Sequence, residues 1–540
     1  MLNSRNLIDG NTTHLQRVAN VIFWLAVIYV CWYKLWLSSA LPFTIPMFSD
    51  HDGKWFLKAA LSIYKGEWFG SPYTHFTLIK SPVYPVFLSF LANTGIHPKL
   101  AIDLLYVGAS LVFLSALRSA IHNRLAVFLG FVIVLANPIA FSEYWATLLR
   151  LNLFMPLVLI YLSSILALIA HASKDEPRIS LPWSLVCALS LAVAWYTREE
   201  AIWMISALAP MVLITFLCFF KKKQRLQVLV FWLLVVLLPN LLGQYFSSIN
   251  KERYGFDGIA DTRAPEFSRA ISAIYSLNTA NDGSYRYFTF ETRDKLKSIS
   301  ENTLRVIEPL LDSEHGGYTY FNDGIGGGFA SWAIRDSMYH LGYYRDPERT
   351  ELAYKEIADD IEEFCLQKAE NCRKTYVPGV LVKPVSWKRF STEIQSGVIK
   401  LVQFTPYEPA DRLAEKDRGD SKYQYLVSRL FNFSTSWDEE LEQRAGILNI
   451  EKKRIRRIGS IYSSYKDGLF FLLLATLVGC SIAIFFSKKM APKLAGLLFV
   501  GSFAGSYSVY LLISLYAVPG FPRLLAIVSI PLLGFTAYFL

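Results

Sequence analysis

Long apolar runs recur along this 540-residue chain, and they constrain its fold more than any other feature. An apolar run of about 20 residues can cross the roughly 30 Å hydrocarbon layer of a membrane as an α-helix. Only 18% of the residues are charged, fewer than the roughly 25% found in soluble domains. We therefore predict a polytopic α-helical membrane protein with about ten transmembrane helices, near residues 20–40, 100–117, 125–141, 151–170, 181–197, 201–220, 226–246, 467–487, 493–515 and 521–540.

Basic residues beside these runs predict how the chain is oriented. Lys and Arg are enriched in cytoplasmic loops, and here they occupy alternate loops, at Arg118 and Arg124, Lys174 and Arg178, the KKKQR block at 221–225, and Lys488, Lys489 and Lys493. The pattern predicts cytoplasmic N- and C-termini. It also accounts for much of the net charge of +10 without a nucleic-acid partner. No A-x-A-like cleavage site follows the first run, so residues 20–40 are predicted to remain as an anchor.

The remaining segments divide the chain into three predicted parts. Residues 1–248 form an N-terminal transmembrane module, and residues 461–540 form C-terminal transmembrane helices. Between them, residues 249–460 are predicted to form a mostly helical extracytoplasmic domain, long enough to bury its own core. The module carries external loops at 41–82, 142–150 and 197–200, followed in the first case by a short apolar piece at 83–95 that is predicted to be re-entrant or interfacial.

Two of the six cysteines, Cys365 and Cys372, belong to the predicted external segment. An oxidising outer compartment favours a disulfide between them. The alternative is two unpaired thiols, and the additional ligands that a zinc site needs do not accompany them.

Charged residues gather in sequence-distant loops that are all predicted to lie on the outer face. Ionisable groups near membrane depth are costly and therefore indicate function. A carboxylate there can take a proton from a hydroxyl, and Arg or Lys can hold a phosphate. With an apolar groove for a lipid tail, this chemistry suits sugar transfer from a lipid-phosphate carrier. The residues are Asp50, His51, Asp52, Lys80, Glu143, Arg150, Arg198, Glu199, Glu200 and Arg523.

Each of these side chains also has a purely structural interpretation. Asp50 and Asp52 can cap an interfacial helix at about 53–65, because Asp is a good N-cap residue. The other structural interpretations are a solvated His51 in place of a metal ligand, a Glu143–Arg150 pair, helix-end charges at Arg198, Glu199 and Glu200, and an interfacial anchor at Arg523.

Several of these loops resemble those of GT-C glycosyltransferases, integral membrane enzymes that use polyprenyl-phosphate sugars. The first external loop carries the family's pattern as Asp52, Phe56, Ala60, Ile63 and Gly66. Three further stretches are similar to the family's Pro-containing stretch, Arg-containing helix end and Arg-bearing last loop, namely KSPVYPVFL (80–88), YTREEAIW (196–203) and FPRLL (521–525). One bacterial branch of GT-C-like proteins also shares L-x-K-x-P-x-Y-P, TREE, W-A-x-R-D and G-Y-Y, so the resemblance spans nearly the whole chain.

The resemblance implies a GT-C fold in a bacterial inner membrane and the transfer of a single sugar, with inversion, from a polyprenyl-phosphate donor. Its spacing matches Asp52 to the family's catalytic aspartate. Gly53 stands where the family often carries a second acid, so Asp50 or Glu143 is expected to position acceptor or donor. The donor phosphate is expected at Lys80, Arg150, Arg198 and Arg523, and the substrates near His51, Tyr84, Glu199 and Glu200. The acceptor is a glycan, lipid or protein at the outer face, and whether a divalent cation takes part is open.

Three other functions are open from the sequence. A glycan ligase or oligosaccharyltransferase would move a preassembled glycan from a diphosphate carrier and add several sugars at once. A transporter is expected to place charge at mid-helix in two repeated halves, and no internal repeat is evident here. A receptor or scaffold without catalysis would tolerate replacement of all the loop acids together.

Overall fold

The fold was examined in a computed structural model that describes most of the chain. The described residues are 4–41, 52–142, 145, 147–173, 179–219, 224–277, 286–288, 290–300, 303, 325–372, 387–403, 429–431, 453–461, 463–464, 489–516 and 522–539.

Six stretches of helix within these ranges are long and apolar enough to cross a membrane, by length and composition. They show that the chain is an integral membrane protein. The stretches lie in α1 (Ser4–Ser38), α4 (Pro98–Ala120), α7 (Leu151–Ala172), the 3-10 helix η2 (Glu199–Leu208) with α9 (Ala209–Phe219), α10 (Arg225–Tyr254) and α21 (Met490–Tyr516).

The other predicted spans have different outcomes. Two form apolar helices that are too short to count as spans, α5 (Arg124–Leu135) and α8 (Leu181–Trp195). The run 125–141 stops at Ala136 because Asn137 and Pro138 begin a separate 3-10 turn, in which the Asn137 side chain accepts from the Ile139 N–H; Pro disfavours helical geometry in the residue before it. The last run forms α22 (Pro522–Phe539), and the run 467–487 lies outside the described residues.

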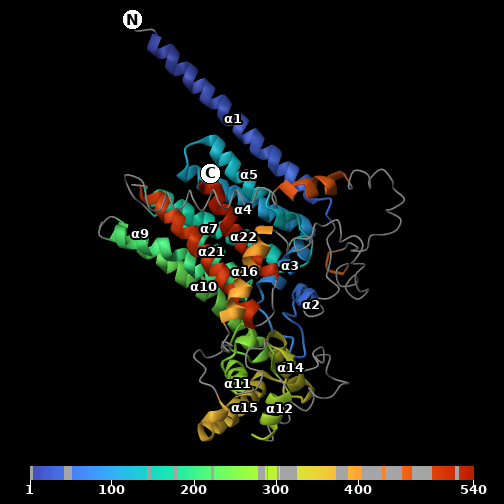
Figure 1. Cartoon of the computed structure of the whole chain (residues 1–540). Helices are drawn as coiled ribbons and strands as arrows, with labels where there is room; N and C mark the ends of the chain where they lie inside the picture. The colour runs from blue at the N-terminus through green and yellow to red at the C-terminus, as the bar shows by residue number, and fades with distance from the viewer. Residues whose placement is uncertain are drawn as a thin grey trace.

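α7 forms the centre of the bundle, packed between α4, α8, α21 and α22. In the most apolar stretch of α7, 94% of the residues are buried. In that of α1, which lies at the edge of the bundle (Figure 1), only 11% are buried. Close packing also joins η2 to α21. A side chain at Gly505 would collide with Ser206, whose hydroxyl donates to the Gly501 carbonyl at 3.0 Å. Small residues of this kind let membrane helices approach each other closely.

Two short helices, α2 (Asp52–Tyr64) and α3 (Val83–Thr94), pack on each other beside one end of the bundle. α3 has 12 residues, which is too short to span a membrane. After α2 the chain turns through Gly66, whose φ of +80° lies in the left-handed region. Only glycine adopts that conformation at no steric cost, which explains the glycine in the first-loop pattern.

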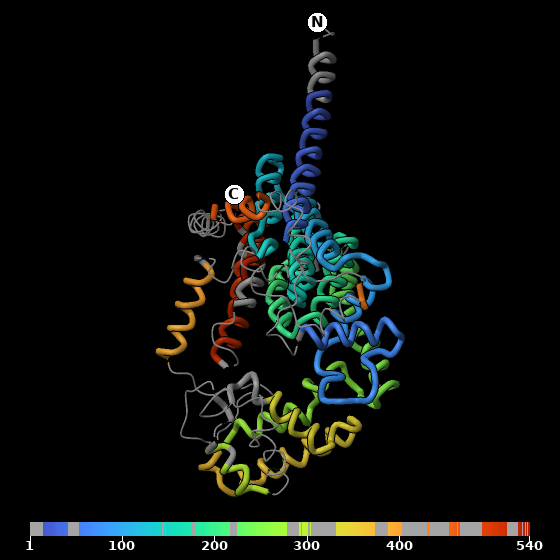
Figure 2. The backbone as a smooth tube through the Cα atoms, turned by 90° about the vertical axis from the view of Figure 1, so that its right-hand side faces the viewer, coloured from blue at the N-terminus to red at the C-terminus, as the bar shows by residue number. Residues whose placement is uncertain are grey.

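A separate helical unit lies beyond this end of the bundle in both views (Figure 1, Figure 2). Its core contains Phe267, Ile274 and Ile357, and the sulfurs of Cys365 and Cys372 are bonded to each other. We call it the lower unit, and the end of the bundle that faces it the rim. It consists of η4 (Asp261–Arg263), α11 (Pro265–Ser276), α12 (Phe290–Lys297), α14 (Gly327–His340), α15 (Pro347–Gln367), η5 (Ala369–Asn371) and a small antiparallel pair of strands, β1 (Arg286–Phe288) and β2 (Ile325–Gly326).

The helix α16 (Trp387–Gln403) lies along α21. The Arg389 guanidinium donates to the Leu515 carbonyl at 2.8 Å, and the Tyr507 hydroxyl donates to the Ile394 carbonyl at 2.7 Å. Part of the segment 249–460 therefore packs directly against a membrane helix. The start of α1 and the end of α22 lie at the end of the bundle away from the lower unit (Figure 1).

Candidate functional site

Five of the charged residues predicted from the sequence lie together at the rim. Arg150, at the start of α7, donates from Nη1 to both carboxylate oxygens of Glu199, at 2.9 and 2.7 Å. Arg198 holds Glu200 with two parallel hydrogen bonds of 3.0 and 2.8 Å. Lys80 and Arg150 both act electrostatically on Glu199. We call Lys80, Arg150, Arg198, Glu199 and Glu200 the rim cluster.

An aromatic ring on α2 lies beside two of the three cations of this cluster. The Phe56 ring centroid lies 5.5 Å from Lys80 Nζ and 5.5 Å from Arg150 Cζ. Lys80 Nζ also lies 5.8 Å from the ring of Trp332 on α14. These distances fall within the roughly 6 Å range of cation–π attraction. Rings from α2 and from the lower unit thus lie around the same ammonium group.

Backbone hydrogen bonds fix the segment that carries Lys80. The Asp261 N–H donates to the Leu78 carbonyl at 2.9 Å, and the Thr262 hydroxyl donates to the Ile79 carbonyl at 3.2 Å. Pro82 then caps α3 on the other side of the lysine. The position of Lys80 therefore depends on η4, a turn about 180 residues later in the sequence. The two hydrogen bonds oppose the loop-closure entropy that favours separation of such distant segments.

The two arginines are fixed by their own helix ends. The Asn152 amide donates to the Trp145 carbonyl at 3.2 Å and to the Thr147 carbonyl at 2.6 Å, which folds the loop before α7 and places Arg150. At the end of α8 the Thr197 hydroxyl donates to the Val193 carbonyl at 2.7 Å, so that Arg198 emerges where the helix stops.

The charge balance of the rim cluster suits an anionic ligand. Three cations face two carboxylates, so the described members carry an excess of one positive charge. Lys80, Arg150 and Arg198 are all buried, whereas the Glu199 side chain is 41% exposed. An arriving phosphate can compete with so exposed a carboxylate for the guanidinium of Arg150, since Arg binds both groups in the same forked geometry.

Tyr84 adds a hydrogen-bond donor beside the cluster. Its ring meets Phe56 edge to face, with centroids 5.0 Å apart, and its side chain is fully buried. The hydroxyl has no hydrogen-bond partner among the residues that the structure describes. A buried hydroxyl without a partner is costly, so this group is available to donate to a ligand.

The other predicted residues are placed less completely. Asp52 is the first residue of α2, one turn before Phe56, and Arg523 is the second residue of α22; the structure describes the backbone of both and not their side chains. Asp50, His51 and Glu143 lie outside the described residues.

A second buried cluster, which the sequence analysis missed, joins α1 to α4. Lys34 and Lys99 bind opposite oxygens of Asp103, at 2.6 and 2.5 Å. Ser38 and Trp145 also donate to Asp103, at 2.9 and 2.8 Å. We call Lys34, Lys99 and Asp103 the α1–α4 triad. Its signals in the sequence are a lysine inside the apolar run 20–40 and two opposite charges four residues apart at the start of α4.

A third charged group lies where α14 meets the first external loop. Arg335, from the W-A-x-R-D motif, pairs with Asp261 at 2.8 Å with both side chains buried, and it also donates to the His75 carbonyl. The Tyr73 hydroxyl donates to Asp261 at 3.3 Å. His75 Nε2 lies 3.2 Å from Asp336, and burial lowers the pKa of His75 below its ordinary value. The motif thus fastens the lower unit to the loop that carries Lys80.

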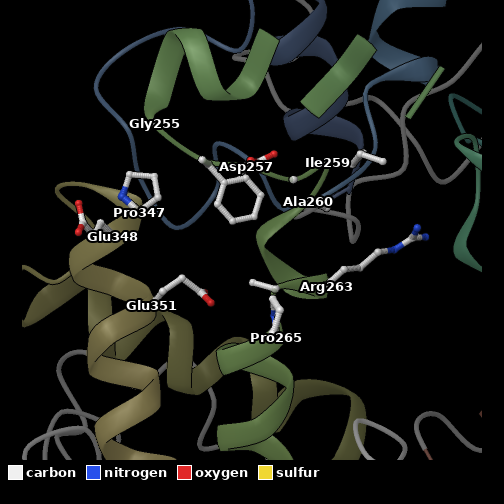
Figure 3. A pocket seen from close by; sticks show the side chains of 12 residues that line it. Gly255, Asp257, Ile259, Ala260, Arg263, Pro265, Pro347, Glu348 and Glu351 are labelled. Atoms are coloured by element: carbon white, nitrogen blue, oxygen red, sulfur yellow. The ribbon is translucent and has the colours of Figure 1, made fainter. Parts of the chain in front are cut away.

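The lower unit also contains a cavity of about 350 Å³ (Figure 3). Glu351 lines it, and burial, reinforced by the charges of Asp261 and Glu266, raises the pKa of this carboxyl to about 7. The Arg263 side chain points away from Glu351 (Figure 3). The lining residues are Gly255, Phe256, Asp257, Gly258, Ile259, Ala260, Arg263, Ala264, Pro265, Pro347, Glu348 and Glu351. Among the described ranges, no group of three or more His, Cys, Asp or Glu side chains is arranged to hold a metal ion.

Comparison with known proteins gives little further guidance. No protein-family model matches the chain, and no curated protein matches it. Among solved structures the chain is similar to the crystal structure of ArnT from Cupriavidus metallidurans bound to undecaprenyl phosphate, with 12% sequence identity, 91% of this chain and 77% of that chain covered, and a TM-score of 0.31. A likeness at this level does not establish a shared fold or activity, so the interpretation of the site rests on its own residues.

Proposed function

We propose that the protein is a GT-C-type glycosyltransferase that moves a single sugar from a polyprenyl-phosphate donor to an acceptor hydroxyl on the extracytoplasmic side of a bacterial inner membrane. One observation carries the proposal. Lys80 and Arg150, from two sequence-distant segments, lie beside the Phe56 ring, and Arg198 pairs with Glu200 next to the Glu199 that Arg150 binds. Phe56 stands one helical turn after Asp52.

The rim cluster would hold the donor phosphate. Arg150 and Arg198 offer forked donors, and Lys80 adds a point charge whose hydration is limited by Phe56 and Trp332. The Tyr84 hydroxyl would donate to a phosphate oxygen. Cations that are held in place in a site with little water stabilise developing negative charge without having to reorganise. Arg523, at the start of α22, is proposed as a further phosphate ligand.

Transfer would proceed as a single displacement. Asp52 takes the proton of the acceptor hydroxyl, and the acceptor oxygen attacks the anomeric carbon from the face opposite the phosphate. The bond between that carbon and the phosphate oxygen breaks, and its electron pair leaves with the polyprenyl phosphate. The configuration at the sugar is therefore inverted. Asp50 or Glu143 would position one of the substrates, with His51, Glu199 and Glu200 nearby.

The lower unit would cover the site and select the acceptor. Its α14 contributes Trp332 over Lys80, and its η4 fixes the segment before Lys80. This assignment places the segment 249–460 outside the cytoplasm, with both termini inside, as the basic loops predict.

The proposal is tested with Asp52→Asn in the full-length protein. Because Asn keeps the size of the side chain and loses its basicity, transfer should be abolished while polyprenyl phosphate still co-purifies and the melting temperature is unchanged. The product is measured by mass spectrometry of the cell-envelope glycans, and Asp257→Asn at an exposed position between α10 and η4 serves as the control. Near-normal turnover in Asp52→Asn would overturn the mechanism, and a gain of several sugars in one step would assign the protein to the glycan ligases.

A further inference from the structure

A short basic helix, residues 453–461, is fixed to the end of α1. Arg454 donates from Nη1 to the Ser39 hydroxyl at 3.1 Å, and its Cζ lies 4.8 Å from the ring centroid of Trp36. Arg457 also reaches that ring, at 5.6 Å. The helix is therefore attached to a membrane helix at the level where that helix ends.

This helix has two different faces. Ile458 is buried against Leu37, Leu41 and Phe141, with Ile461 packed beside it. Its exposed basic residues are Lys453, Arg456 and Arg457, and residues 453–461 include no Asp or Glu. An apolar face on the bundle and a basic face directed away from it are typical of helices that lie in a membrane interface.

The layer beneath the helix adds positive charge. Phe141, which Ile458 covers, also lies 5.5 Å from Lys34 Nζ of the α1–α4 triad. The triad sets two ammonium groups against one carboxylate, so its described members leave one positive charge in excess. Buried charges are screened by salt much less than exposed ones. The α1–α4 triad therefore adds to the positive charge of the basic helix and supplies no negative charge to neutralise it.

The position of this charge runs against the topology that the other basic loops predict. Residues 452–457 read KKRIRR, five basic residues in six, and the predicted span 467–487 follows within ten residues. Basic residues so close to a span favour the cytoplasmic side, yet the orientation predicted from the other loops places these outside. They outnumber the basic residues of the KKKQR block, which is predicted to be cytoplasmic. The predicted topology therefore does not explain these basic residues, whereas an anionic ligand at the outer interface explains them.

We propose that Lys453, Arg456 and Arg457 form a binding surface for the phosphate headgroup of an anionic membrane lipid, such as phosphatidylglycerol, beside α1. The surface is separate from the rim cluster, and the inference does not depend on the proposed transferase activity. Its ligand is a phosphate that is attached to a lipid in the bilayer, because the helix is held in the interface by Ile458 and its basic face meets the headgroup layer.

The test compares lipid retention by the full-length protein and a triple variant, Lys453→Gln with Arg456→Gln and Arg457→Gln. Native mass spectrometry counts the phosphatidylglycerol and phosphatidylcholine molecules that stay bound in mixed vesicles of the two lipids. The parent protein should retain phosphatidylglycerol preferentially, and the triple variant should bind it more weakly, on the order of tenfold or more, since each basic residue near an anionic surface adds to the attraction.

Two further variants separate charge from structure. Arg456→Lys with Arg457→Lys keeps the charge and should keep the preference, even if the contact of Arg457 with Trp36 is lost. Arg349→Gln with Lys355→Gln and Lys368→Gln removes the same charge from exposed positions in the lower unit and should also keep it. Equal retention by the parent and the first triple variant, or equal retention of both lipids by the parent, would overturn the proposal. Displacement of the lipid by excess inorganic phosphate would likewise overturn it and assign the surface to free phosphate.

Discussion

The rim cluster and the α1–α4 triad both hold buried cations in excess over carboxylates at the same end of the bundle, but they differ in how far they are closed. In the triad, the side chain of Asp103 is only 4% exposed. Its carboxylate accepts hydrogen bonds from Lys34, Lys99, Ser38 and Trp145. In the rim cluster the Glu199 side chain is 41% exposed. Beside the cluster, the buried hydroxyl of Tyr84 has no hydrogen-bond partner among the described residues.

This difference separates a structural use of buried charge from a ligand-binding use. The triad joins α1, α4 and Trp145 through one carboxylate whose two oxygens are both occupied by cations. The rim cluster retains an exposed carboxylate that a phosphate can replace. Removing one partner from a buried ion pair leaves an uncompensated charge, so loss of a partner should destabilise the triad. Removal of Lys80 from the rim cluster should mainly weaken ligand binding, because the carboxylate on which it acts, Glu199, is exposed.

The largest effect is expected for Asp103→Asn. The substitution leaves Lys34 and Lys99 buried with no opposing charge, and breaking a buried pair in this way costs about 3–5 kcal/mol. Thermal unfolding in detergent should show a large drop in melting temperature. The double variant Asp103→Asn with Lys34→Met removes one of the stranded charges and should recover part of the loss. A normal melting temperature in Asp103→Asn would show that the triad is not a structural link.

A second closed group, Asp261 with Arg335, allows a similar test in the lower unit. Arg335→Gln leaves the Asp261 carboxylate buried, at a cost of about 3 kcal/mol, the lower end of the range for a broken buried pair, because the Tyr73 hydroxyl still donates to it. Hydrogen exchange should increase in the loop around His75 and in α14 and stay unchanged in α7. Faster exchange throughout the bundle would contradict a local role.

The sequence predicts the rim cluster better than the triad for a physical reason. Lys80, Arg150 and Arg198 lie in loops between apolar runs, and once the loops are assigned to one side of the membrane their residues share a face. Lys34 and Asp103 lie inside apolar runs, where only three-dimensional packing decides whether a charge meets a partner. The same limit applies to α16, whose contact with α21 depends on Arg389 and Tyr507 finding backbone carbonyls far along the chain.

Helix boundaries were predictable only in part. The long run that became α7 is apolar throughout, and it forms the buried centre of the bundle. The run at 201–220 is apolar as well, but its first part belongs to a 3-10 helix from Glu199 to Leu208. Pro210 in α9 lacks the N–H that an α-helix would donate to the Ser206 carbonyl, and that carbonyl instead accepts from the Ala209 N–H, the i to i+3 bond of a 3-10 helix. Hydropathy does not report such a change in hydrogen bonding.

A third prediction examines the open cluster directly, with Lys80→Gln. A hydrogen bond to a charged group contributes about 1.5–3 kcal/mol, so retention of polyprenyl phosphate should weaken by roughly tenfold to a hundredfold, with little change in melting temperature. Co-purified lipid is measured by mass spectrometry, and Lys58→Gln, on the exposed side of α2, is the matched control. A fall in stability as large as that of Asp103→Asn, with lipid retention unchanged, would make both clusters structural and remove the contrast between them.

The smallest effect is expected at Glu351, a carboxyl that is neither paired like Asp103 nor as exposed as Glu199. Its pKa rises from 4.5 to about 7 in the folded protein, so the folded state binds the proton more tightly than the unfolded chain does. The associated stability is fully present below about pH 4.5 and is lost as the pH rises through about 7.

Replacement of Glu351 by Gln should remove this pH dependence, because the amide stays neutral and can still accept from the Glu266 N–H, which donates to Glu351 at 3.3 Å. Melting temperatures of the variant and the parent should agree at low pH and separate toward pH 8, with the variant the more stable, since only the parent then carries an ionised carboxylate beside Asp261 and Glu266. Parallel curves at all pH values would show that Glu351 ionises as freely as an exposed carboxyl, which would place it with Glu199 among the open groups.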